Sequence, residues 1–85
     1  MMGTETSQIY MIKKRKEGTI VSFRMGTNHG IKPGMQLDVV NEDGFLVGIV
    51  EIFMSTETES EALIVGQNSI SLGCSIKTSG SAKQG

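Results

Sequence analysis

The segment Gly26-Thr-Asn-His-Gly-Ile-Lys-Pro-Gly-Met-Gln-Leu-Asp-Val-Val40 places a glycine-rich loop directly before a stretch of alternating apolar and polar residues. Its glycines are spaced four residues apart: Gly26, Gly30 and Gly34. Glycine adopts positive φ without steric cost and proline fixes its own φ at about −65°, so Pro33-Gly34 predicts a type II turn. Residues 35–40 predict the strand that follows, and Ile31 is expected in the core beneath the loop.

These glycines admit a second interpretation, a nest of backbone N–H groups that binds an anion. The phosphate-binding loop pattern places lysine directly after its last glycine, whereas Ile31 follows Gly30 in this chain. The closely spaced glycines of a dinucleotide-binding pattern are also missing. Turn chemistry is therefore the preferred interpretation of the loop.

Short alternating segments separated by turn residues predict six strands. Their expected bounds are 8–16, 19–25, 35–40, 45–53, 60–65 and a last strand within 71–78. Val21, Phe23 and Met25 share one face of the second strand, because side chains alternate along a strand. Asp43-Gly44 is expected to supply the positive-φ positions of a hairpin turn, and Gly48 predicts a bulge or bend. The pattern predicts an all-β fold, a small antiparallel barrel that is closed or partly closed.

The chain of 85 residues is long enough for one domain with a modest core. We expect a disordered segment over 1–7, a single barrel domain over 8–78, a turn over 66–69 and a flexible tail over 79–85. Cys74 is the only cysteine, so no intrachain disulfide can form, and a full-length chain is expected in the cytoplasm. No membrane span is expected, because the longest apolar run is far too short to cross a bilayer.

Charge is distributed unevenly along the sequence. Residues 1–32 carry six cations against two acids, a net charge of +4, whereas residues 33–76 carry seven acids and no lysine or arginine. This asymmetry predicts a bipolar surface if the two halves are segregated in space.

Four consecutive cations form the basic run, residues 13–16. They are joined as candidate binding residues by two further cations, which gives the set Lys13, Lys14, Arg15, Lys16, Arg24 and Lys32. Such a run suits phosphate backbones or anionic surfaces, although a solvated strand end capped by Glu17 is the preferred explanation. Strand alternation divides the run between two faces, and only Tyr10 is nearby for base stacking. Nucleic-acid binding, if present, is expected to be weak, salt-sensitive and indifferent to sequence.

No constellation of catalytic or metal-ligating residues is evident. His29 and Cys74 are the only soft metal ligands, whereas a structural zinc site uses four, so no metal or cofactor is expected. Cys74 lies in an alternating apolar stretch and is expected as a small buried hydrophobe. Glu57, Glu59 and Glu61 are expected as a solvated face. The sequence therefore predicts a protein that is not an enzyme.

Five segments together resemble the C-terminal SH3-like β-barrel of bacterial flagellar assembly protein T and related envelope-protein barrels. The segments are Gly18-Thr-Ile-Val, Met25-Gly-Thr-x-x-Gly30-Ile-Lys-Pro-Gly34-Met-x-Leu-x-Val, Val47-Gly-x-Val-x-Ile52, Ser60-x-Ala-x-Ile64 and Leu72-Gly-x-x-Ile76. The resemblance implies a small barrel used for assembly and protein contacts, without catalytic residues. It also implies a location in the bacterial envelope if the chain is a fragment of an exported protein.

These observations favour a non-enzymatic interaction or assembly module that contacts another protein or a second copy of itself. Ile20, Ile49 and Leu63 are expected on the outer face of their strands, where they would supply the apolar centre of such a contact. The alternative is a small barrel that binds nucleic acid through the basic run.

Overall fold

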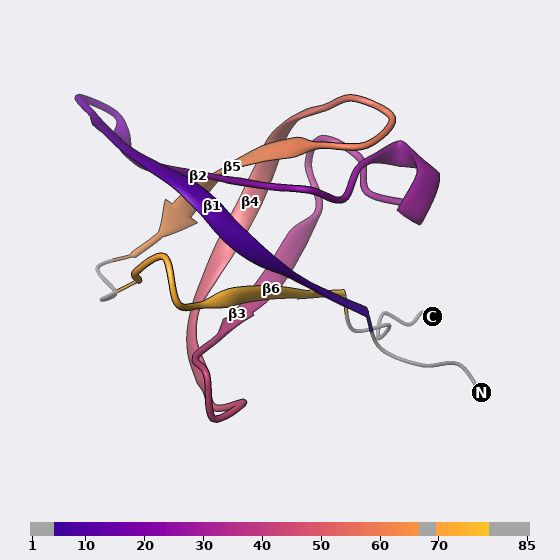
Figure 1. Ribbon diagram of the computed structural model, residues 1–85. Helices are drawn as coiled ribbons and strands as arrows, with labels where there is room; N and C mark the ends of the chain where they lie inside the picture. Colours follow the sequence, from indigo (N-terminus) through magenta and orange to yellow (C-terminus); the bar gives the residue numbers. More distant parts are fainter. Residues whose placement is uncertain (1–4, 67–69, 79–85) are drawn as a thin grey trace.

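Six antiparallel strands close into a barrel in the computed structural model, which describes residues 5–66 and 70–78 (Figure 1). The elements are β1 (Glu5–Arg15), β2 (Gly18–Phe23), the 3-10 helix η1 (Thr27–His29), β3 (Gln36–Val40), β4 (Leu46–Ser55), β5 (Ser60–Val65) and β6 (Ser75–Thr78). Around the barrel the order is β1-β2-β5-β4-β3-β6. The predicted all-β fold, a small closed antiparallel barrel, is confirmed.

β1 closes the barrel by pairing with two different strands. Residues 5–8 pair with β6, and residues 9–15 pair with β2. Between these halves the register shifts from Ile9 to Met11, so Tyr10 is an extra residue that bends the strand. Because β6 pairs with β1, the first and last strands lie side by side, and β6 pairs with β3 on its other edge (Figure 1).

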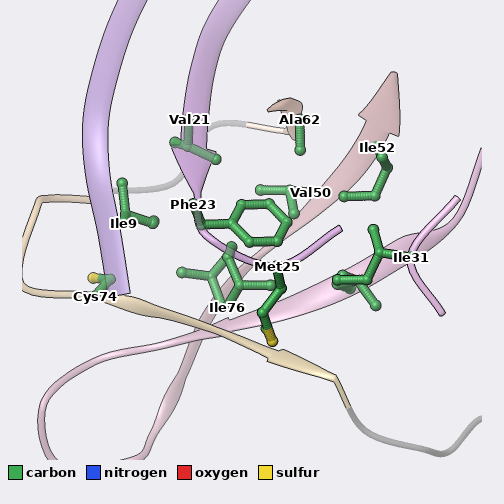
Figure 2. Packing of buried hydrophobic residues seen from close by; sticks show 12 residues of the cluster. Ile9, Val21, Phe23, Met25, Ile31, Val50, Ile52, Ala62, Cys74 and Ile76 are labelled. Carbon is green, nitrogen blue, oxygen red and sulfur yellow. The ribbon is translucent and has the colours of Figure 1, made fainter. Parts of the chain in front are cut away.

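The core fills the barrel from all six strands and the loop before β3. Phe23 is fully buried at its centre, surrounded by aliphatic side chains from neighbouring strands (Figure 2). The predicted inward face of β2 is confirmed, since Val21, Phe23 and Met25 are all buried. Cys74 is also buried, as expected of a small hydrophobe. Full burial of each large aliphatic or aromatic side chain stabilises the fold by about 1.5–3 kcal/mol.

The loop between β2 and β3 contains the predicted turn. Gly34 has φ of 94°, and the Met35 N–H donates to the Lys32 carbonyl oxygen at 3.2 Å, which closes a type II turn around Pro33. Ile31 is 1% exposed, as the sequence predicted. The loop is thereby fixed at both ends, to the core and to the start of β3.

The β3–β4 turn differs from the prediction in one respect. Gly44 has φ of 88°, but none of the described non-glycine residues has positive φ, so Asp43 does not share this role. The Asn41 side-chain oxygen accepts from the N–H groups of Asp43 and Phe45, at 2.9 and 3.0 Å, and supports the turn instead. The predicted bulge at Gly48 is confirmed, because Val39 pairs with Gly48 and the next pair skips Val47.

Strand boundaries differ from those predicted by more than one residue in β1, β2 and β4, and β4 continues to Ser55 rather than ending at Phe53. β1 begins at Glu5, so residues 5–7 are not disordered but paired with β6, a partner far away in the sequence. β2 ends at Phe23 rather than Met25, where the Arg24 N–H donates to the Ser7 hydroxyl at 3.1 Å. The predicted tail over 79–85, residues 1–4 and most of the turn over 66–69 lie outside the described residues.

Candidate interaction surface

A cross-strand row of four side chains crosses the outer face of the barrel. Lys13 of β1 pairs with Ile20 of β2, Ile20 pairs with Leu63 of β5, and Leu63 pairs with Glu51 of β4. Directly paired residues of antiparallel strands point to the same side of the sheet. The row therefore carries a cation at one end, an acid at the other and two aliphatic side chains between them.

A groove of about 610 Å³ lies over the middle of this row. Its apolar lining is Ile20, Phe53, Leu63, Ile64 and Val65, and its charged lining is Arg15, Glu17 and Glu51. Phe53 is 48% exposed and Val65 is 40% exposed, although both are large apolar side chains. The groove thus combines an apolar surface with charges of both signs.

The apolar surface continues beyond the groove. Val65 pairs with Ile49, and both line a second hollow of about 330 Å³ together with Leu46. Leu46 is 61% exposed. Contiguous apolar side chains on a protein surface mark sites of interaction, whereas single exposed ones do not.

Local irregularities in the strands shape the groove. The β4–β5 register shifts between Ile52 and Met54, so Phe53 is the extra residue of a bulge, with its side chain exposed. Gly18 has φ of 140°, and a Cβ there would lie 3.4 Å from a Leu63 methyl carbon. Glycine is favoured at this position by its positive φ, since a Cβ would make only an ordinary contact with Leu63 where the β1–β2 turn meets the groove.

The outer-face residues predicted for a protein contact are brought together. Ile20 and Leu63 are direct partners in the groove, and Ile49 lies on the adjoining hollow. Phe53, Val65 and Leu46 were not predicted from the sequence as part of this surface. Their signal was the high apolar content of β4 and of the end of β5, which exceeds what one inward face requires.

The predicted basic site is not brought together as a unit. All four side chains of the basic run are exposed at the end of β1 and in the following turn, and only Arg15 lines the groove. Arg24 lies at the opposite end of β2, about 20 Å from that turn at the rise of a β-strand. Lys32 lies in the loop before β3.

Arg24 belongs to a different contact at the surface. Its guanidinium lies 4.7 Å from the ring centroid of Tyr10, and the Tyr10 hydroxyl donates to a Glu59 carboxylate oxygen at 3.0 Å. Desolvation raises the pKa of Tyr10, and the hydrogen bond to Glu59 raises this pKa further. The contact links β1 and β2 to the β4–β5 turn.

The two oppositely charged parts of the sequence contact each other at the groove and at Tyr10. Arg15 and Glu51 line the same groove, and Arg24 and Glu59 contact the same tyrosine. In the barrel order β1 and β2 are neighbours and β5, β4 and β3 are neighbours, so the basic and acidic parts meet where β2 pairs with β5.

The glycine-rich loop is not an anion-binding nest. Its N–H groups at 27–31 and Gly34 donate to backbone carbonyl oxygens within the protein, at 2.7 to 3.1 Å. The Lys32 N–H donates to the Met35 sulfur at 3.2 Å, and Pro33 has no N–H. The backbone N–H groups of residues 27–32 and of Gly34 are therefore engaged within the protein and do not form a phosphate-binding nest.

The structure also bears on metal binding, on Cys74 and on membrane-spanning helices. Among residues 5–66 and 70–78, no three His, Cys, Asp or Glu side chains gather closely enough to hold a metal ion. The Cys74 sulfur lies 3.9 Å from the Ser71 hydroxyl. In the same part of the chain, no helix is long and apolar enough to cross a bilayer.

No protein family, curated protein or solved structure matches the chain. The resemblance to the flagellar and envelope-protein barrels therefore stays a prediction.

Proposed function

We propose that this protein is a non-enzymatic interaction module that binds a protein partner through the groove and the adjoining hollow. The proposal is supported above all by the exposed apolar side chains of β4 and β5 that line these two concavities, which meet at Val65. Burial of Phe53, Val65 and Leu46 against a partner would remove apolar surface from water, which is the main driving force of association. The resemblance to barrels of envelope assembly proteins supports the same kind of role.

A double variant of the groove tests this proposal. Wild-type protein and a Phe53→Ser/Val65→Ser variant are immobilised, retained proteins are identified from cell extract, and the affinity of a purified candidate is measured by calorimetry. We expect a partner whose affinity falls at least about tenfold in the variant, because central apolar contacts dominate binding energy. Leu72→Ser is the matched control, since Leu72 is 51% exposed but lies outside the groove. Equal binding to all three proteins would contradict the proposal.

Nucleic-acid binding is the second candidate function, and the exposure of all four cations of the basic run favours it. Fluorescence anisotropy of labelled oligonucleotides, at low and physiological salt, would show weak binding that falls steeply as salt rises. Simultaneous replacement of Lys13, Lys14, Arg15 and Lys16 by alanine is expected to abolish that binding. Unchanged affinity in this variant would reject the candidate.

A further inference from the structure

We propose that the protein partner of the groove is a second copy of this chain, held in a two-fold symmetric dimer. In this dimer Lys13 of each copy faces Glu51 of the other, and Ile20 of each faces Leu63 of the other. The inference rests on the proposed function and names the partner. It follows from the order of side chains in the cross-strand row.

The two ends of the row lie apart within one chain. Lys13 and Glu51 are separated by β2 and β5, which is three strand spacings or about 14 Å. Both side chains are exposed. Each copy therefore presents a cation and an acid at a fixed separation, with apolar surface between them.

A two-fold axis makes this row complementary to itself. The axis lies in the interface, parallel to the strands, and passes between Ile20 and Leu63. Rotation about it reverses the row of the second copy, so each cation faces an acid, and the two grooves face each other with their aliphatic side chains lining the shared space. Symmetric dimers require such a patch, because the same surface is used by both copies.

The next row along the strands obeys the same symmetry. Met11 pairs with Ser22, Ser22 pairs with Glu61, and Glu61 pairs with Met54. The same axis brings Met11 of one copy to Met54 of the other, and these side chains are 40% and 38% exposed. Two neighbouring rows, one with charged ends and one with apolar ends, thus fit a single symmetry operation.

The charges of the groove favour a second copy over an unrelated partner of one dominant charge. Arg15, Glu17 and Glu51 line the same concavity, so a strongly acidic or strongly basic surface would meet like charge there. A second copy carries the same mixture in reversed order.

Charge reversal at the two ends of the row provides a sharp test. Sedimentation velocity over a range of protein concentrations gives the dimer dissociation constant of wild type and of the single variants Lys13→Glu and Glu51→Lys. Each variant is expected to raise this constant at least about tenfold, since like charges then meet at two symmetric contacts. Both sites are exposed, and circular dichroism and thermal melting confirm that the variants fold.

An equimolar mixture of the two variants is expected to dimerise with near wild-type affinity. In the mixed dimer the introduced acid of one variant faces the introduced lysine of the other, and the second contact retains Lys13 and Glu51. Lys14→Glu and Glu57→Lys are matched controls with the same changes of charge. Lys14 alternates with Lys13 along β1, and Glu57 lies beyond the end of β4. Neither control should weaken the dimer.

A wild-type protein that stays monomeric to millimolar concentration, or variants that do not recover in the mixture, would overturn the dimer. That failure differs from failure of the proposed function. If the protein is monomeric but binds another protein, and Phe53→Ser/Val65→Ser weakens that binding, only the second copy is rejected as the occupant of the groove. If the protein is monomeric and its binding to other proteins is unaffected by those substitutions, both the dimer and the proposed function are rejected.

Discussion

At the scale of single residues, Gly26 lies where the loop before β3 crosses the β4–β5 turn. A Cβ at Gly26 would lie 2.0 Å from the Thr56 carbonyl oxygen and 2.9 Å from that of Glu57. The next two N–H groups of the loop donate to these same oxygens, at 2.8 and 3.1 Å. The close approach of two backbones therefore depends on the missing side chain.

We predict that Gly26→Ala lowers the free energy of unfolding by about 3 kcal/mol, because backbone atoms must move apart to admit the methyl group. Gly30→Ala is the comparison, since Gly30 has φ of 81° but open space around it. Its cost is expected to be about 1 kcal/mol, from backbone conformation alone. Urea denaturation measures both values, and equal costs would contradict the steric explanation.

The sequence predicts the role of Gly34 better than the role of Gly26. The turn at Pro33 and Gly34 was predictable, because its geometry depends on adjacent residues. Gly26 was also expected as a turn glycine, yet its φ is −140°, which other residues adopt readily. Glycine is required at position 26 because the Thr56 carbonyl oxygen lies so close, and no pattern in the local sequence reveals this contact.

At the scale of elements, the end of β1 has an unpaired edge. Within the part of the chain that the structure describes, residues 11–15 form a ladder with β2 only, whereas residues 5–8 pair with β6. Unpaired strand edges promote association with other chains, and lysine on the edge opposes this. The basic run therefore has a structural explanation besides binding.

Replacement of all four cations of the basic run by threonine is expected to cause aggregation at concentrations where wild type stays dispersed. Threonine favours strands but removes the charge that keeps other edges away. Light scattering over time measures the effect. Replacement by four glutamates is the control, because it restores repulsion with the opposite sign. Aggregation of both variants, or of neither, would contradict the role of edge charge.

Alternation within β2, β4 and β5 was enough to predict that Ile20, Ile49 and Leu63 face outward. It did not predict that Ile20 and Leu63 pair, because β2 and β5 are neighbours in the barrel but distant in sequence. It also missed Phe53, since the bulge there interrupts the alternation. The candidate site was thus predictable residue by residue, but not as a groove.

At the scale of the whole molecule, stability depends on closure of the barrel by its shortest strand. Ile76 of β6 is fully buried and pairs with Val39 of β3 on one side and Ser7 of β1 on the other. Cys74, just before β6, is 4% exposed and is the only cysteine of the chain. Its thiol therefore reports on opening of the barrel.

We predict that Ile76→Ala costs about 3 kcal/mol and makes Cys74 react about a hundredfold faster with a thiol reagent, since each 1.4 kcal/mol corresponds to tenfold. Labelling followed by mass spectrometry measures the rate under native conditions. Leu72→Ala is the control and should leave the rate near that of wild type, because Leu72 is 51% exposed. An unchanged rate in Ile76→Ala would mean that the thiol is reached without opening the barrel.

The pairing of β1 with β6 also has a consequence for synthesis on the ribosome. Glu5 pairs with Thr78, so about 60 residues are translated after the end of β1 before its second partner is complete. At about 10 residues per second, the nascent barrel stays open for several seconds with its apolar interior in contact with water. The cations at the end of β1 are made early in this interval. Their charge then opposes association of the growing chain with other strands before the barrel has closed.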